Sequence, residues 1–374
     1  MKQITTYCVG CRACEQKCPK SCIAILPDKE GFLQPQIDES LCVDCNLCIK
    51  VCPQNHPPEK NNVKRALAIR YKDNKTLYGS ASGGAFIGIA KRVIQQGGIV
   101  FGAVYDNNLV VVHARAESLD ELKGMQSSKY VQSDTQNSYS VTKCFLDKGQ
   151  IVLYTGTPCQ IGGLKKYLGK SYSNLLTIDL ICHGVPSPKL FNRYLIWLEN
   201  TYGGKIIAYD FRSKKTGWGL GYKAKTKTKT KTKYISGICD PYYYHFLKGN
   251  TYRECCYSCN YCTPERISDI TIGDYWGIQK EHPNFFSTKG VSCMLINTDK
   301  GNRLFNEIVS DYYCLNSSFE KIAKHNHNLQ FPTKRNIIRD TIYQSIDDVS
   351  VEFYFKEIMQ YPISIVMKIK NILP

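Results

Sequence analysis

The spacing of apolar and polar residues after position 60 predicts strands and helices in alternation. ALAIRYK (66–72) has the pattern of a strand, and SASGGAFIGIAKRVIQQGG (80–98) has the pattern of a helix that ends at its glycine pair. Five apolar residues share one face of that helix: Ala85, Phe86, Ile89, Ala90 and Val93. GIVFGAVY and LVVVHAR flank Asp106-Asn107-Asn108 and predict a hairpin. Ser118 and Glu121 predict a capping box at the start of a further helix.

The segment from residue 151 to residue 184 predicts a βαβ unit. IVLYTGTPC (151–159) predicts a strand and a turn, PCQIGGLKKYL a helix, and NLLTIDLICHG (174–184) a second strand. The two strands of such a unit run parallel, and ligands collect beyond their carboxyl ends. Cys159 and Cys182 each follow the end of one strand, so we expect both thiols at one edge of the sheet.

A linker separates these elements from the first part of the chain. NHPPEKNNVK (55–64) contains two prolines and no apolar periodicity, which predicts a domain boundary near residue 62. We therefore divide the chain into residues 1–62, 63–150, 151–330 and a helical tail, 331–374. The expected fold is α+β: a small N-terminal domain followed by an α/β domain with a mixed sheet.

Four cysteines and a proline recur with the same spacing in the first domain. CVGCRACEQKCP (8–19) and CVDCNLCIKVCP (42–53) both read C-x2-C-x2-C-x3-C-P. This is the bacterial ferredoxin pattern for 4Fe-4S clusters, in which each fourth cysteine binds the other cluster. The predicted ligands of one cluster are Cys8, Cys11, Cys14 and Cys52. Those of the other are Cys42, Cys45, Cys48 and Cys18.

Disulfides and structural zinc are the alternatives for these cysteines. The chain has 19 cysteines, an odd number, and MKQITTYC offers no apolar export segment, so disulfides are disfavoured. Zinc ribbons use separated C-x2-C pairs with long spacers, unlike the runs seen here. We expect a cytoplasmic protein.

A third cluster is predicted from cysteines further along the chain. Cys256 and Cys259 form another C-x2-C pair, and together with Cys159 and Cys182 they complete a set of four thiols. Plain burial is the alternative for Cys159 and Cys182, and a zinc knuckle is the alternative for the pair. Cys255 and Cys262 lie in the same loop and leave its ligands open. Five further cysteines have no spacing partner and are interpreted as structural: Cys22, Cys144, Cys239, Cys293 and Cys314.

The formal charge of +17 raises nucleic acid as a partner, but its distribution argues against one. Three clusters of charge 2− each, bound by thiolates, would lower the charge to about +11. Six lysines lie in KAKTKTKTKTK (223–233), which predicts an exposed hairpin arm or a basic dock for an acidic electron carrier. No apolar run approaches the length of a membrane span. YPISIVMKIKNILP (361–374) predicts a helix docked on the protein itself.

At residue 63 and beyond, a series of ordered motifs makes the chain resemble a known family. They are SASGGAF, SSKYVQSD, TGTPCQIGGLKKYL, DLICHGVPSP, FRSKKTGW, CYSC and SDITIGDYWGI. In this order they resemble the beta subunit family of the deazaflavin (coenzyme F420) hydrogenases and dehydrogenases over residues 63 to about 300. A fused two-cluster ferredoxin domain is also found in that family.

The resemblance implies a flavin and iron-sulfur oxidoreductase that contains FAD. Cys159, Cys182, Cys256 and Cys259 match the family's cluster-binding motifs. The residues that fall in its flavin-side motifs are Ser82, Gly83, Gly84, Lys129, Tyr130, Gln132, Gly156 and Thr157. A flavin takes up two electrons as hydride and releases them singly, which explains a fused ferredoxin. Ferredoxin or other oxidoreductase subunits are the implied partners, and coenzyme F420 is a candidate substrate; the catalytic residues stay unknown.

Residue chemistry leaves several of these roles open. Ser82-Gly83-Gly84 could offer backbone N–H groups to a phosphate or could simply cap a helix. Lys129 could neutralise a cofactor or be solvated, and Tyr275 and Trp276 could pack on a cofactor or in the core. No Gly-x-Gly-x-x-Gly fingerprint for a nicotinamide dinucleotide is present.

Two other functions are compatible with the sequence. The resemblance extends to ferredoxin-fed reductases of a small metabolite, including relatives associated with surface polysaccharide synthesis. The second alternative is a non-catalytic subunit that only conducts electrons within a larger complex. Direction of electron flow, substrate and oligomeric state are not determined by the sequence.

Overall fold

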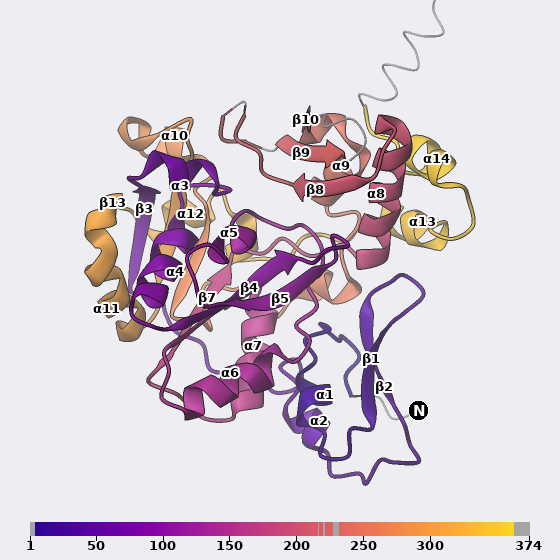
Figure 1. Cartoon of the computed structure of the whole chain (residues 1–374), viewed down its shortest axis with the longest axis horizontal. Helices are drawn as coiled ribbons and strands as arrows, with labels where there is room; N and C mark the ends of the chain where they lie inside the picture. Colours follow the sequence, from indigo (N-terminus) through magenta and orange to yellow (C-terminus); the bar gives the residue numbers. More distant parts are fainter. Residues whose placement is uncertain (1–3, 216, 220, 227–231, 363–374) are drawn as a thin grey trace, which may run out of the picture.

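The computed structural model describes residues 4–215, 217–219, 221–226 and 232–362. Its N-terminal unit is built from the two cysteine repeats and lies at the lower right of Figure 1. Short helices α1 (Ala13–Lys17) and α2 (Leu47–Lys50) each contain the third cysteine of a repeat, and the antiparallel hairpin of β1 (Ile23–Pro27) and β2 (Leu33–Ile37) connects them. This is the ferredoxin-type unit that the spacing predicted.

A mixed eight-stranded sheet forms the centre of the remaining chain, in the order β13-β3-β12-β11-β7-β6-β4-β5. Its strands are β3 (Arg65–Tyr71), β4 (Ile99–Tyr105), β5 (Val111–Ala116), β6 (Val152–Gly156), β7 (Leu175–Leu180), β11 (Ile270–Asp274), β12 (Ser292–Ile296) and β13 (Tyr312–Asn316). β4, β6, β7 and β11 are parallel, and β3 runs with them because it is antiparallel to β12, which is antiparallel to β11. Five strands therefore end at the same edge of the sheet.

Helices cover both faces of this sheet. Along β6, Leu153 packs into one apolar cluster, whereas Val152 and Tyr154 pack into another, as the two-residue period of a strand requires. The first face is covered by α4 (Ala85–Gln95), α5 (Leu122–Met125) and α11 (Asp299–Ile308). The second face is covered by α6 (Ser138–Asp147), α7 (Pro158–Leu168) and α12 (Phe319–Ala323). Two short helices lie in connections: α3 (Asn74–Tyr78) between β3 and α4, and α10 (Ile278–Glu281) between β11 and β12.

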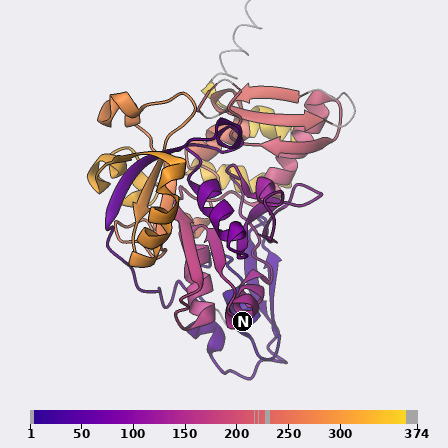
Figure 2. The same ribbon diagram turned by 60° about the vertical axis from the view of Figure 1, so that its left-hand side comes forward.

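A third group of elements lies above the main sheet in Figures 1 and 2. It holds the small antiparallel sheet β10-β9-β8 and an aromatic core that includes Tyr194, Tyr242 and Phe211. The elements are α8 (Pro188–Tyr202), β8 (Ile206–Asp210), β9 (Gly221–Thr226), β10 (Thr232–Ser236), α9 (Pro241–Leu247), α13 (Ile338–Gln344) and α14 (Val351–Phe353).

The predicted elements are largely confirmed. The helix that stops before the glycine pair, the β4–β5 hairpin and the parallel β6-α7-β7 unit are all present. Ser118 and Glu121 form the hydrogen bonds of a capping box, but the helix that follows, α5, begins at Leu122. β9 and β10 pair as the basic hairpin, with β10 at the edge, although residues 227–231 lie outside the described part. The predicted terminal helix, 361–374, also lies outside it from residue 363 onward.

The ferredoxin-type unit is joined to the main domain by buried polar contacts. Arg12 pairs with Asp134, and Thr135 Oγ1 donates to the carbonyl of Cys11 at 2.9 Å. Arg253, only 2% exposed, donates through Nε to the carbonyl of Cys8 at 2.6 Å and through NH2 to that of Leu33 at 2.8 Å. The cluster loops are thereby held in one place against the larger domain.

Glycine in α7 allows the closest approach between the two units. A Cβ added to Gly163 would lie 2.9 Å from Cys11 Sγ and 2.8 Å from the hydroxyl of Tyr139. α1 packs against α7 at this position, so the first cysteine repeat touches the helix whose first turn carries Cys159.

We expect Gly163→Ala to destabilise the protein. Helix propensity alone favours alanine by up to about 1 kcal/mol, but an overpacked contact costs about 1–3 kcal/mol. The melting temperature of the iron-loaded protein should therefore fall.

The matched control is Gly124→Ala in α5, where an added Cβ would meet its nearest neighbour at an ordinary 3.6 Å. That variant should be as stable as the parent or more so. An unchanged or higher melting temperature for Gly163→Ala would contradict the close packing of α7 on the cluster loop.

Candidate redox site

The two cysteine repeats adopt the same backbone turn. Arg12 and Asn46, which follow the second cysteine of each repeat, both have left-handed backbone angles, with φ of 58° and 57°. Each begins the short helix that carries the next cysteine. The sequence repeat is thus also a structural repeat, and the two loops curl in the same way.

The structure brings the ferredoxin cysteines together in the two predicted sets. Cys8, Cys11, Cys14 and Cys52 form the first thiol group, in which burial raises the pKa of Cys8, Cys11 and Cys14 and neighbouring thiols raise it further. Cys18, Cys42, Cys45 and Cys48 form the second thiol group and line one cavity. Each set takes its fourth cysteine from the other repeat.

A third thiol group lies at the carboxyl edge of the sheet. Cys159 stands in the first turn of α7, directly after β6, and its Sγ is 3.2 Å from Thr157 Oγ1. Cys182 stands two residues after β7, the parallel neighbour of β6. Burial raises the pKa of both thiols, and Cys259 raises it further. A hydrogen bond with the Cys255 side chain and burial raise the pKa of Cys256, and Cys182 and Cys259 raise it further, so all four predicted cysteines gather here.

Two residues lie between the first and third thiol groups. Cys255 is close enough to influence the pKa of both Cys8 and Cys159. Tyr261 is close to Cys159 and Cys11, and its hydroxyl donates to the carbonyl of Pro53 at 2.9 Å. The two groups therefore adjoin.

Burial opposes ionisation of Cys8, Cys11, Cys14, Cys159 and Cys182, and an iron cluster would supply the positive charge that their thiolates need. Cys259 differs, because a hydrogen bond with the Cys262 side chain lowers its pKa to about 7. Within the described residues, no three His, Cys, Asp or Glu side chains are arranged to hold a single metal ion. The thiolates of a 4Fe-4S cluster bind different iron atoms, so their spacing is set by the cluster.

A charged and aromatic cluster lies beyond the third thiol group, at the same sheet edge. Arg212 is 2% exposed and binds Asp274, the last residue of β11, through two hydrogen bonds of 2.8 Å. The indole of Trp218 donates to Asp274 Oδ1 at 2.7 Å and stacks on Trp276 with a centroid distance of 5.4 Å. Tyr130 accepts a hydrogen bond of 2.9 Å from Arg212. We call these five residues the Arg212 cluster.

His183 connects the Arg212 cluster with the third thiol group. It follows Cys182 in the chain, and Asp274 and Arg212 both influence its pKa, which burial lowers. Both sites are built at the ends of β7 and β11, which are parallel neighbours.

Two lysines with lowered pKa lie near the Arg212 cluster. Lys214 is 6% exposed and donates to the carbonyls of Leu77, at 2.8 Å, and Ser82. Burial, together with the charge of Arg212, lowers its pKa to about 7. Burial also lowers the pKa of Lys129 to about 8, against the opposing effect of Asp210. Lys129 makes one hydrogen bond, of 3.3 Å, to the carbonyl of Gln126.

The predicted flavin-side residues are divided between several environments. Tyr130 and Lys129 lie at or near the Arg212 cluster, and Gly156 and Thr157 lie at the end of β6 beside Cys159. The amide of Gln132 instead contacts the ferredoxin loops, donating to the carbonyl of Val9 at 3.4 Å and accepting from Arg253 at 3.3 Å.

In the SASGG loop, the side chain of Ser82 and the backbone N–H of Gly83 donate hydrogen bonds to other residues of the protein. Ser82 Oγ donates to the carbonyl of Val291 at 2.8 Å, and the Gly83 N–H donates to Ser292 Oγ at 2.8 Å. Gly83 also fits closely between β3 and β12, because an added Cβ would lie 2.4 Å from the carbonyl of Ile69. Gly84, with φ of 78°, precedes α4. Of the two roles predicted for this loop, these contacts favour the structural one at Ser82 and Gly83.

Sequence reasoning assigned no role to Arg212, Lys214, Trp218, Arg253 or Asp274. Four of them lie in the motifs FRSKKTGW and SDITIGDYWGI, which served only to establish the resemblance. Their joint presence in one series of motifs is the signal that could have directed attention to them. Tyr275, one of the residues left open, is fully buried and belongs to the core.

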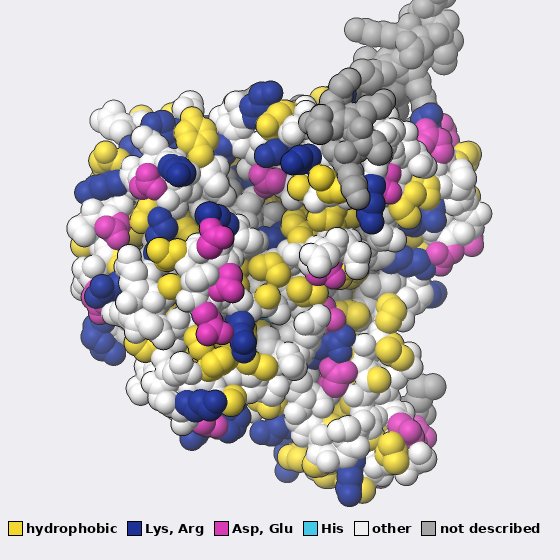
Figure 3. Space-filling model, viewed as in Figure 1, with side chains coloured by type: hydrophobic (Ala, Val, Ile, Leu, Met, Phe, Trp, Pro, Cys, Tyr) yellow, Lys and Arg dark blue, Asp and Glu magenta, His cyan; other side chains and the backbone are white. Residues whose placement is uncertain are grey.

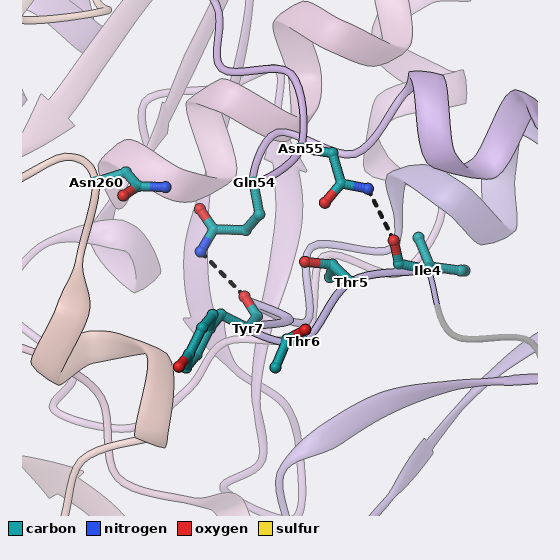
Figure 4. A pocket seen from close by; sticks show the side chains of 7 residues that line it. All are labelled: Ile4, Thr5, Thr6, Tyr7, Gln54, Asn55 and Asn260. Carbon is teal, nitrogen blue, oxygen red and sulfur yellow. Dashed lines mark hydrogen bonds between the residues drawn. The ribbon is translucent and has the colours of Figure 1, made fainter.

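A polar hollow opens at the surface of the ferredoxin-type unit (Figure 4). It is lined by Thr5, Tyr7, Gln54 and their neighbours, and Gln54 Nε2 donates to the carbonyl of Tyr7 at 3.0 Å. None of the predicted cluster or flavin residues lines this hollow.

The fold and the thiol groups define an iron-sulfur electron-transfer protein. Residues 7–56 match the family model of the 4Fe-4S dicluster domain, and residues 149–321 match that of the C terminus of the coenzyme F420 hydrogenase/dehydrogenase beta subunit. Residues 149–321 thus belong to this beta subunit family and residues 7–56 to the dicluster domains, as the motifs in these two parts indicated.

Three curated relatives match short stretches of the chain. It is 38% identical over 45 residues to the ferredoxin-type protein NapF of Escherichia coli K12, covering 12% of this chain and 27% of that protein. It is 40% identical over 52 residues to the 7Fe ferredoxin of Hydrogenibacillus schlegelii, covering 13% and 60%. It is 40% identical over 57 residues to ferredoxin-2 of Chlorobaculum tepidum, covering 14% and 84%. The chain thus spans about a quarter of the first relative and more of the two small ferredoxins.

Among solved structures, the chain is similar to one from the F420-reducing NiFe hydrogenase complex of Methanosarcina barkeri, with a TM-score of 0.48 and 15% identity. The similarity covers 73% of this chain and 90% of that one. None of the helices in the described part of the chain has the length and apolar character needed to cross a membrane.

We expect the burial of Lys214 to produce a pH-dependent stability. Its native pKa of about 7 lies below the usual 10.5, so the native state binds fewer protons than the unfolded state between these values. The free energy of unfolding should therefore rise between pH 7 and pH 10, by up to about 4 kcal/mol, and this gain should be lost as pH falls from 10 back to 7.

The test compares melting temperatures of the parent and Lys214→Met at pH 7 and pH 9.5. The melting temperature of the parent, relative to that of Lys214→Met, should be higher at pH 9.5 than at pH 7. Lys72→Met, a change at an exposed lysine, is the control and should show no such trend. A difference between parent and Lys214→Met that is the same at both pH values would contradict the lowered pKa.

Proposed function

We propose that the protein is a flavin and iron-sulfur oxidoreductase that passes electrons between a two-electron, deazaflavin-type partner and one-electron carriers. The family supplies the oxidoreductase class and the dicluster domain. FAD, a third cluster at Cys159, Cys182, Cys256 and Cys259, and coenzyme F420 as substrate belong to the proposal.

The observation that carries the proposal is the uninterrupted succession of sites. Cys14 of the first thiol group is influenced by Cys48 of the second, and Cys255 lies close to both the first and third groups. His183 then connects the third group with the Arg212 cluster. Such a series gives single electrons a route from the sheet edge to the ferredoxin-type unit.

The residues around the Arg212 cluster fit a flavin dinucleotide. The guanidinium of Arg212 is fully used by protein acceptors, so its role is to position Asp274 and Tyr130. Lys129 keeps N–H donors beyond its hydrogen bond to Gln126 and would face the anionic part of the cofactor. The hydroxyl of Tyr105, whose ring lies under Lys129, is buried without a partner among the described residues. Trp218 and Trp276 provide an aromatic surface.

A bound flavin would exchange electron pairs as hydride with one partner and single electrons with the clusters. The chain's own part is to hold the cofactor at the sheet edge, next to the third thiol group. Lys214 and Lys129, with pKa values of about 7 and 8, can also gain or lose a proton near neutral pH.

The distribution of charged side chains at the surface bears on the choice of partner. On the face shown in Figure 3, Lys and Arg side chains are scattered among Asp and Glu. The exposed lysines Lys225 and Lys233 of the β9–β10 hairpin are the more suitable contact for an acidic electron carrier.

The third cluster is tested by counting iron. Anaerobically reconstituted protein should hold about 12 iron and 12 sulfide per chain, and Cys159→Ala should lower each by about four, because a cluster that loses a buried ligand is not retained. Cys144→Ala, a change at an exposed cysteine of α6, is the control and should leave the count unchanged. About eight iron in the parent, or no loss in Cys159→Ala, would refute the third site.

The flavin role is tested by offering FAD-loaded protein reduced coenzyme F420, NADH and reduced ferredoxin separately. We expect bleaching of the flavin absorbance by the deazaflavin or by ferredoxin, and little by NADH, because no nicotinamide fingerprint is present. With reduced F420 as donor, the flavin absorbance of Cys159→Ala should still bleach. The variant should nevertheless reduce viologen much more slowly than the parent.

The outcomes separate the candidate functions. Bleaching by ferredoxin alone would replace the proposal with a ferredoxin-fed reductase of a small metabolite. Failure to retain FAD after gel filtration, with clusters that respond only to dithionite, would indicate an electron-transfer subunit without a flavin.

A further inference from the structure

The two cysteine repeats differ at the fourth position after their last cysteine. The first repeat continues as Cys18-Pro-Lys-Ser-Cys22, whereas the second continues as Cys52-Pro-Gln-Asn-His56. Only in the first repeat, therefore, does a further cysteine follow four residues after the last one. That last cysteine, Cys18, belongs to the second thiol group. The sequence pattern gave Cys22 no role beyond a structural one.

The backbone returns Cys22 to the neighbourhood of Cys18. Ser21 adopts a left-handed conformation, with φ of 49°, and its N–H donates to the carbonyl of Cys18 at 3.3 Å. Cys22 immediately precedes β1, and its carbonyl accepts a hydrogen bond of 2.8 Å from the Asp38 N–H. Its Sγ thus lies 3.3 Å from Cys18 Sγ.

Cys22 also faces the same cavity as the second thiol group. It is 6% exposed and lines the cavity together with Cys18, Cys42, Cys45 and Cys48. Cys42 as well as Cys18 influences its pKa. The site therefore holds five thiols, one more than a 4Fe-4S cluster binds.

We propose that Cys22 is a reserve ligand of the second cluster and can bind the iron atom that Cys18 otherwise binds. A metal-thiolate bond is about 2.3 Å long, so an iron bound to Cys18 lies at most about 5.6 Å from Cys22 Sγ in this arrangement. Rotation of the Cys22 side chain closes part of that distance. In the exchange, the iron bond to Cys18 breaks as the bond to Cys22 forms, the proton of Cys22 passes to Cys18, and no electron is transferred.

The asymmetry of the repeats supplies a matched experiment. Cys18→Ala and Cys52→Ala each remove the crossing cysteine of one repeat. The repeat itself supplies a nearby thiol in the first case, Cys22, whereas His56 holds that position in the second. After anaerobic reconstitution, Cys18→Ala should keep the iron and sulfide content of the parent, whereas Cys52→Ala should lose up to about four iron. The double variant Cys18→Ala/Cys22→Ala should lose as much as Cys52→Ala, and Cys22→Ala alone should lose none.

Iron and sulfide are counted chemically, and electron paramagnetic resonance of the oxidised protein reports clusters that have lost one iron. Serine replacements at Cys18 and Cys52 repeat the comparison with side chains of almost unchanged size, so that misfolding of an alanine variant does not decide the result. Equal losses in the Cys18 and Cys52 variants would overturn the proposal. So would full iron content in the double variant, or loss of a cluster in Cys22→Ala alone.

Discussion

The arrangement of the redox sites depends on the buried guanidinium of Arg253. It binds the carbonyls of Cys8 and Leu33 in the ferredoxin-type unit and lies two residues before Cys255, in the loop of the third thiol group. A buried charge that satisfies its donors on two units resists their separation, because either unit alone would leave it unpaired. Cluster loops and sheet edge are therefore held at a fixed separation.

The direction of the strands determines where the chemistry can gather. β6, β7 and β11 run parallel, so Thr157, Cys182 and Asp274 emerge at the same edge although they are distant in sequence. The glycines of α7 then let the first cysteine repeat approach that edge from the second face of the sheet. Packing of small residues and the hydrogen bonds of Arg253 together set how close the first and third thiol groups come.

Sequence reasoning was most successful where the signal is local. The repeated cysteine spacing, the β6-α7-β7 unit and the glycine stop after α4 all depend on residues within about 45 positions of one another. The pairing of Arg212 with Asp274 spans 62 positions, and that of Arg253 with Cys8 spans 245. Periodicity carries no information on such pairs. Gln132 illustrates the difficulty: its motif indicated the flavin side, yet its amide contacts the ferredoxin loops because of how the units dock.

The third group of elements contributes the polar and aromatic partners that the sheet edge lacks. Arg212 and Trp218 follow β8, whereas Asp274 ends β11, so the Arg212 cluster forms only when the small sheet lies above the main one. Its charges are internally matched, which leaves Lys129 and Lys214 as the groups with lowered pKa beside it. Burial is what lowers the pKa of both lysines, because it removes water from the charged form. An anionic ligand beside them, such as the proposed cofactor, would stabilise their charged forms and raise both pKa values.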